Sequence, residues 1–168
     1  VEYDTQFSAT TNNELSLTGL TDGEYTYEGL CFDALNHNGS TGTQYYTVDT
    51  TNPSLVFNPN SNRNGAYDQD YLWINVTATD ANFHNITAIL MEGASVINTT
   101  FSLNETGEFN FTSLSDGVYQ LYLTAYDVLG HSYSPDIEEF IIDGMAPVVS
   151  YGGGMLVDGS YTNQNTVY

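Results

Sequence analysis

Residues 114–119 read LSDGVY, and residues 20–25, which lie 94 positions earlier, read LTDGEY. When the chain is aligned with itself at that offset without gaps, 17 of the 74 overlapping positions are identical. A period of 94 residues has the length of a whole domain and exceeds that of solenoid repeats. The repetition therefore predicts similar domains in series.

The same offset sets the expected domain boundaries. It places Pro53 on Pro147, and each proline follows a short apolar segment and an aspartate. We predict that residues 1–52 are the C-terminal half of one domain, that residues 53–146 are a complete domain, and that residues 147–168 are the first strands of a following domain. Either the chain is a segment of a longer array, or strands are shared between subunits.

The complete repeat has the period-two alternation and the frequent turn residues of β-structure. We predict seven strands, at residues 55–57, 71–79, 86–91, 96–103, 108–113, 118–127 and 137–143. Seven short strands in about 94 residues are typical of an immunoglobulin-like sandwich. The predicted fold class is therefore all-β, with tandem antiparallel β-sandwiches of the immunoglobulin-like (fibronectin III-like) type.

The repeated phrase is expected to form the turn between the fifth and sixth of these strands. Asp116 would accept hydrogen bonds from the N–H groups of its own turn, and Gly117 would allow a positive φ. Leu114 and Tyr119 would then face the core from the two sides of the turn.

Three features together resemble the immunoglobulin-like repeats of bacterial and archaeal cell-surface proteins. They are the DG-x-Y turn, the D-x-L-G-H turn at residues 127–131 and the junction VDTTNP at residues 48–53. The second junction, IDGMAP at residues 142–147, departs from the pattern in its middle. Tyr119 is similar to the tyrosine corner of such sandwiches. The resemblance implies a surface-layer glycoprotein, an adhesin stalk or an extracellular filament.

The charge of the chain limits the classes of partner that it can bind. The chain has 21 acidic residues and one basic residue, Arg63, which gives a formal net charge of −20. Such a surface repels phosphate backbones and excludes nucleic-acid binding, whereas it attracts cations. No segment approaches the roughly 18–20 consecutive apolar residues of a membrane span. The single cysteine, Cys31, excludes an intrachain disulfide and aligns with Ala125, so we expect it in a core.

Catalysis is not predicted. His37 and His131 occupy the same repeat position, and a catalytic site seldom recurs in every domain. No nucleophile elbow, zinc-protease motif or phosphate-binding loop is present. We therefore expect a non-enzymatic protein in which these histidines stabilise turns or lie on the surface.

Calcium is the one cofactor that the sequence leaves open. Asp49 and Asp143 recur at the junctions, and Asp33 and Asp127 recur in the D-x-L turns. Calcium prefers several oxygen ligands from such loops, and the resemblance implies junction sites in some members. The same aspartates are equally suited to turn formation, which is the alternative interpretation.

Six N-x-S/T sequons predict N-glycosylation. Their asparagines are Asn38, Asn75, Asn85, Asn98, Asn104 and Asn110. Five of them lie between residues 75 and 110, and Asn75 and Asn110 alternate with apolar neighbours, which predicts that they face water. The alternative is that a β-surface rich in asparagine and threonine contains sequons by chance.

Four aromatic residues are predicted on outward faces: Tyr71, Trp73, Tyr122 and Tyr126. Exposed aromatic side chains favour lateral packing of copies, but an ordinary surface or carbohydrate recognition would also explain them.

The sequence thus predicts a structural extracellular segment that assembles with copies of itself or with other surface-layer or filament subunits. The alternatives are an adhesin stalk that binds a host or polysaccharide ligand and an accessory module of a secreted hydrolase. A stalk would act mechanically, because proline and aspartate at each junction would limit the angle between rigid domains.

Overall fold

The computed structural model describes residues 17–149, and all regular structure in that range is β-strand. The strands are β1 Gly23–Tyr27, β2 Leu30–Phe32, β3 Asn38–Ser40, β4 Gln44–Val48, β5 Ser54–Phe57, β6 Gly65–Tyr67, β7 Tyr71–Thr79, β8 Phe83–Glu92, β9 Ser95–Ser102, β10 Thr106–Thr112, β11 Gly117–Asp127, β12 Ser132–Tyr133 and β13 Glu138–Ile142. The described residues include no helix that is long and apolar enough to cross a membrane.

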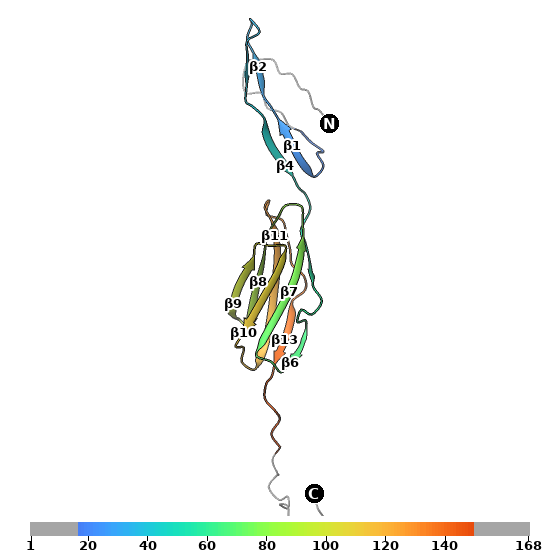
Figure 1. The fold of residues 1–168 in the computed structure, drawn as a ribbon, viewed down its shortest axis with the longest axis vertical. Helices are drawn as coiled ribbons and strands as arrows, with labels where there is room; N and C mark the ends of the chain where they lie inside the picture. Colours follow the sequence, from blue (N-terminus) through green and yellow to red (C-terminus); the bar gives the residue numbers. More distant parts are fainter. Residues whose placement is uncertain (1–16, 150–168) are drawn as a thin grey trace, which may run out of the picture.

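Strands β5 to β13 form a two-layered sandwich (Figure 1). One sheet has the order β10-β7-β5. The other has the order β6-β13-β11-β8-β9, with β12 paired to β11. Neighbouring strands are antiparallel except β6 and β13, which are parallel. Strand β9, which follows β8 in the chain, pairs with β8 in the larger sheet. This position of β9 is the fibronectin III arrangement of the immunoglobulin-like sandwich.

The core lies between the two sheets because each long strand alternates buried and more exposed residues. In β7, for example, Leu72, Ile74 and Val76 are fully buried, and the residues between them are partly exposed. The same alternation holds in β10 and β11. Burial of each large apolar side chain contributes about 1.5–3 kcal/mol, which makes this interior the main source of stability.

The seven predicted strands are confirmed, with ends that differ by up to three residues. Two short strands, β6 and β12, were not predicted. Their hydrogen-bond partners are β13 and β11, and the three residues of β6 are too few to show an alternation. Pairing of β6 with a strand 75 positions away has no local signal in the sequence.

The turn formed by LSDGVY places Leu114 and Tyr119 in the core, as predicted. The Tyr119 hydroxyl donates to the Ser115 carbonyl oxygen at 3.0 Å, which is the tyrosine-corner contact. The expected positive φ at Gly117 is wrong, because the left-handed residue of this turn is Ser113, with φ 60°. A Cβ at Gly117 would instead lie 2.6 Å from a carboxylate oxygen of Glu92.

The N-terminal part of the described chain repeats the last strands of the sandwich in detail. The β1–β4 ladder pairs Gly23 with Val48, and the β11–β13 ladder pairs Gly117 with Ile142, the residues 94 positions later. Below, the residue 94 positions away is called the counterpart. Cys31 is exposed, contrary to the prediction of a core position, because none of the described strands covers the face that is buried at its counterpart Ala125.

Candidate functional site at the junction between the repeats

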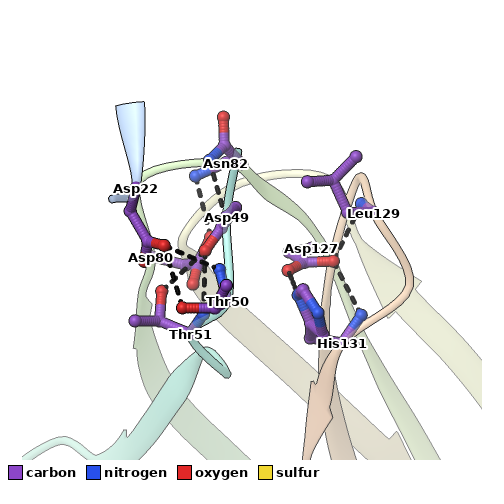
Figure 2. A network of polar contacts seen from close by, with 9 residues as sticks. All are labelled: Asp22, Asp49, Thr50, Thr51, Asp80, Asn82, Asp127, Leu129 and His131. Atoms are coloured by element: carbon purple, nitrogen blue, oxygen red, sulfur yellow. Dashed lines mark hydrogen bonds and ion pairs between the residues drawn. The ribbon is translucent and has the colours of Figure 1, made fainter. Parts of the chain in front are cut away.

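The segment that joins β4 to β5 is held to the sandwich by Asp49. This carboxylate is buried, and its Oδ1 accepts hydrogen bonds from the Thr51 N–H and hydroxyl at 3.0 and 2.8 Å. Its Oδ2 accepts a hydrogen bond from Nδ2 of Asn82, in the turn between β7 and β8, at 2.7 Å (Figure 2). Pro53, at the end of the segment, is fully buried.

Thr50, the residue after Asp49, is hydrogen-bonded to the N-terminal strands. Oδ1 of Asp22, just before β1, accepts hydrogen bonds from the Thr50 N–H and hydroxyl at 3.0 and 2.9 Å. Consecutive residues of the junction are thus bonded to the N-terminal strands and to the sandwich. Such a connection resists bending more strongly than a segment without side-chain contacts.

The turn after β11 lies beside this junction and is closed by Asp127 and His131. Asp127 is buried, and its Oδ1 accepts hydrogen bonds from the N–H groups of Leu129 and His131 at 2.9 and 2.8 Å. Its Oδ2 lies 2.6 Å from Nδ1 of His131. The counterparts Asp33 and His37 make the same three contacts, so both histidines stabilise turns, as predicted.

The structure brings Asp49 and Asp127 together, although 78 positions separate them. Together with His131 they offer three potential ligand atoms within 4.8 Å of one another. The other two predicted metal ligands lie elsewhere: Asp33 is in the β2–β3 turn, and Asp143 follows β13 at the opposite end of the sandwich. His131 and Asn82 were not predicted as part of this site, because only the fold reveals their proximity.

The hydrogen bonds at the junction shift the pKa values of Asp49, Asp127 and His131. The backbone N–H of Thr51 is the main cause that lowers the pKa of Asp49 below its ordinary value of 3.8. Burial raises the pKa of Asp127, but hydrogen bonds from His131 and Leu129 outweigh burial and lower it. The hydrogen bond to Asp127 outweighs burial at His131 and raises the pKa of the imidazole, with further support from the charges of Asp127, Asp49 and Asp80.

These shifts predict a stability maximum at mildly acidic pH. Asp49 and Asp127 contribute stability that is present above pH 3.8 and is lost as the pH falls through their lowered pKa values. His131 contributes stability that is fully present below pH 6.5 and is lost as the pH rises through its raised pKa. The melting temperature, measured from about pH 3 to about pH 9, should therefore be highest between about pH 4 and 6.5.

The variant His131→Gln should abolish the decline of melting temperature above pH 6.5. His37→Gln is the matched control, because the His37–Asp33 pair has the same geometry with side chains 75% and 52% exposed. Exposed pairs contribute little to stability, so the control should keep the wild-type profile. An unchanged decline in His131→Gln would contradict the role given to His131.

The junction cluster fits calcium poorly in its present hydrogen-bonded form. Calcium takes about six to eight oxygen ligands, whereas this cluster offers two carboxylates and one imidazole nitrogen. Both oxygens of Asp49 and of Asp127 already accept hydrogen bonds from the protein. We therefore expect EDTA to leave the melting temperature unchanged. A lower melting temperature in EDTA that is restored by added calcium would support the calcium site.

The predicted glycosylation sites differ in accessibility. Asn38, Asn98, Asn104 and Asn110 are exposed, and Asn75 and Asn85 are half-buried. Oδ1 of Asn75 accepts a hydrogen bond from Asn58 at 2.6 Å. Oδ1 of Asn85 is buried and has no hydrogen-bond partner among the described residues. A glycan requires a side chain that reaches water, so the four exposed positions suit attachment best.

The four aromatic residues predicted as an assembly surface lie on two separate surfaces. Tyr71 and Trp73 lie on the outer face of the three-stranded sheet, in β7. Tyr122 and Tyr126 lie on the outer face of the larger sheet, in β11. Because the sheets pack face to face, the two pairs point in opposite directions and cannot contact one partner together.

Strand order, antiparallel pairing and the tyrosine corner define the class of the molecule: it is an all-β protein with an immunoglobulin-like, fibronectin III-like sandwich. No protein-family model matches the chain, and no curated protein matches it.

Three solved structures are similar to the chain. Domains d3–d4 of the rat CD45 extracellular region have 14% identity and a TM-score of 0.41, over 82% of this chain and 74% of that chain. The fibronectin(III)-like modules of Clostridium thermocellum CbhA have 16% identity and a TM-score of 0.40, over 81% and 71%. An engineered protein has 15% identity and a TM-score of 0.41, over 54% of this chain and 20% of that chain.

Proposed function

We propose that the chain is a non-enzymatic, structural segment of an extracellular surface-layer or filament protein of bacterial or archaeal type. In this proposal residues 1–52, 53–146 and 147–168 belong to successive immunoglobulin-like domains. The segment is N-glycosylated and assembles with copies of itself. Its function is mechanical: it separates and aligns other parts of a surface structure.

The observation that carries the proposal is the repetition of junction and turn contacts at the 94-residue offset. Asp22 binds the Thr50 N–H, and its counterpart Asp116 binds the Gly144 N–H, at 3.0 and 2.9 Å. The hydroxyl of Tyr25 binds the Thr21 carbonyl oxygen as Tyr119 binds Ser115. A site for chemistry needs to occur once, whereas a spacer gains length from each repeat.

Charge and exposed asparagines agree with a location at the cell surface. A net charge of −20 keeps neighbouring chains soluble and attracts cations. Exposed sequons at Asn98, Asn104 and Asn110 could carry glycans without disturbing the core. Peptide mapping of protein isolated from the native organism should therefore find glycopeptides at these positions. Unmodified peptides at all six sequons would contradict the glycoprotein part of the proposal.

The spacer function predicts that Asn82→Ala loosens the junction. This change removes the side chain that holds Asp49 to the sandwich, so residues 23–48 should move more independently. Backbone ¹⁵N relaxation should give similar rotational correlation times for these residues and the sandwich in the wild type, and a shorter time for residues 23–48 in the variant.

Asn98→Ala is the control, because Asn98 is an exposed asparagine of β9 away from the junction. It should leave both correlation times unchanged. If residues 23–48 already move independently in the wild type, the junction is flexible and the rigid-spacer function is wrong.

A further inference from the structure

The outer face of the larger sheet presents a group of apolar and aromatic side chains to solvent. Ile89 of β8 and Tyr122 of β11 are paired near its centre and are half-buried. The ladders between β9, β8, β11 and β13 place the outward-facing side chains of these strands on one surface, called the apolar face below. Five of its residues are 37–64% exposed: Val96, Phe101, Val118, Tyr126 and Ile141. A contiguous exposed apolar surface of this kind marks an interaction site.

The apolar face is also nearly free of charge. Among the outward-facing residues of its four strands, Glu139 is the one charged residue. The whole chain has a formal net charge of −20, so most contacts between two copies bring carboxylates together. Like charges that meet in an interface oppose binding. Two copies can therefore meet through the apolar face with little repulsion.

The polar side chains of the apolar face already have hydrogen-bond partners beside them. The Tyr122 hydroxyl donates to Oε1 of Gln120 at 3.3 Å. The hydroxyl oxygens of Thr124 and Ser134 lie 2.8 Å apart. Burial of a polar group without a partner is costly, and these contacts avoid that cost when the face is covered.

The outer face of the smaller sheet is more polar. Side-chain hydrogen bonds join Asn58 to Asn75 at 2.6 Å and to Thr77 at 3.0 Å. Glu108 and Asn110 are exposed beside them in β10. Covering this face would remove several amide and carboxylate groups from water, so it suits contact between copies less well.

The sequons are also distributed unequally between the two faces. Asn110 is exposed on the smaller sheet, whereas the sequon of the apolar face is at Asn85, whose Oδ1 is buried. Asn98 of β9 is opposite Leu90, a core residue, so its side chain is not on the apolar face. A glycan at Asn110 would cover the smaller sheet and leave the apolar face bare.

The size of the apolar face suits a reversible contact. Neighbouring strands lie about 4.8 Å apart and each residue rises about 3.4 Å, so four strands along residues 85–91 span roughly 20 by 24 Å. Two such faces together bury about 1,000 Å², which is at the low end of specific interfaces. We therefore expect an equilibrium between monomer and dimer.

We propose that two copies of the chain pair face to face through their apolar faces, with Ile89 and Tyr122 of each copy near a two-fold axis. The contact rests on the proposed self-assembly and specifies where it occurs. Packed sheets lie about 10 Å apart, so the side chains of the two faces interdigitate. In a two-fold contact the same surface serves both copies, so an uncharged face is complementary to itself.

Two valine substitutions test which face forms the contact. Val96→Glu places a carboxylate on the apolar face. Val56→Glu is the matched control, because Val56 is 58% exposed on the outer face of the smaller sheet and Val96 is 59% exposed. Both variants and the wild-type chain are compared by sedimentation equilibrium. A reducing agent keeps the exposed Cys31 from cross-linking copies.

The mass of the wild-type chain should rise with concentration toward that of a dimer. Val96→Glu should raise the dimer Kd at least about tenfold, because the two-fold contact contains the new carboxylate twice. Val56→Glu should raise it less than about twofold. Higher salt should lower the wild-type Kd, since it screens the net charge without weakening an apolar contact.

Removal of the one carboxylate on the apolar face should have the opposite effect. Glu139→Gln should lower the dimer Kd about threefold, because each copy then brings one negative charge fewer to the contact. Glu108→Gln is the control, because it changes the net charge equally on the outer face of the smaller sheet. Equal effects of the two glutamine variants would overturn the assignment of the contact to the apolar face.

The outcomes separate this contact from the proposed function. A chain that stays monomeric at every concentration overturns the contact, since the apolar face then serves a different partner, and it leaves the rigid-spacer test of Asn82→Ala unaffected. Dimers that Val96→Glu weakens no more than Val56→Glu also overturn the contact, and they leave the assembly function standing. The fluorescence of Trp73, the single tryptophan, verifies that each variant has a folded sandwich.

Discussion

Replacement of Phe140 by alanine is expected to lower the free energy of unfolding of the sandwich by about 3–5 kcal/mol. Phe140 is fully buried in β13 and packs against Tyr67, in the edge strand β6. Its removal leaves a cavity between two sheets that the rigid ladders on both sides keep apart. The expected loss is a large part of the roughly 5–15 kcal/mol that stabilises an ordinary domain.

The matched control for this substitution is Tyr46→Ala at the counterpart position. Tyr46 is 59% exposed, so its replacement should change the free energy of unfolding by less than about 0.5 kcal/mol. Urea unfolding, followed by the fluorescence of Trp73 at low protein concentration, reports on the sandwich in which Trp73 lies. Equal losses in the two variants would contradict the conclusion that Tyr46, unlike Phe140, contributes little to the stability of the sandwich.

The second large effect is expected for Arg63→Ala, which should cost about 2–3 kcal/mol. Nε and Nη2 of Arg63 both donate to Oε1 of Glu138, at 2.9 and 2.5 Å, and the Asn64 N–H donates to Oε2 at 2.7 Å. The guanidinium carbon also lies 4.0 Å from the centroid of the Phe57 ring.

The loss arises mainly at Glu138, because its side chain is only 5% exposed and loses its cationic hydrogen-bond partner. The estimate is below the range for a fully buried pair, since the Arg63 side chain is 56% exposed. Glu138→Gln in the Arg63→Ala background should recover about 1 kcal/mol, because a neutral amide needs no cation. Arg63→Lys should cost about 1 kcal/mol, since lysine keeps the charge but not the planar group. A change below about 0.5 kcal/mol in Arg63→Ala would contradict this role.

Local sequence patterns predicted the strands because the alternation of buried and exposed positions can be seen within the residues of each strand. Alternation in residues 71–79 and 118–127 shows which side chains face a core, and the repeated DG-x-Y phrase marks the turn that starts a strand. The identity of Asp127 and His131 with Asp33 and His37 similarly predicted two equal turns, and the structure has them.

Other features were missed because they depend on partners far away in the chain. The three residues of β6 are a strand only because β13 lies beside them. The proximity of Asp49 to Asp127 and His131 arises from the position of the junction at the end of β11. The exposure of Cys31 reflects which strands cover a face, and no residue near Cys31 in the sequence contains that information.

The sequence by itself therefore determined the all-β class, the period of the repeat and the position of the repeated turns, because these depend on side-chain alternation and on turn residues that are close neighbours. The conformation of Gly117 and the partner of Asp116, which is the N–H of Gly144 and not of its own turn, came only from the structure. Only the tertiary structure decided that Glu138 is buried beside the one cation and that the four aromatic residues face opposite ways. It also decided that β4 pairs with β1 alone among residues 17–149. These properties depend on which strands pair across the sandwich, and pairing is set by the packing of the whole core.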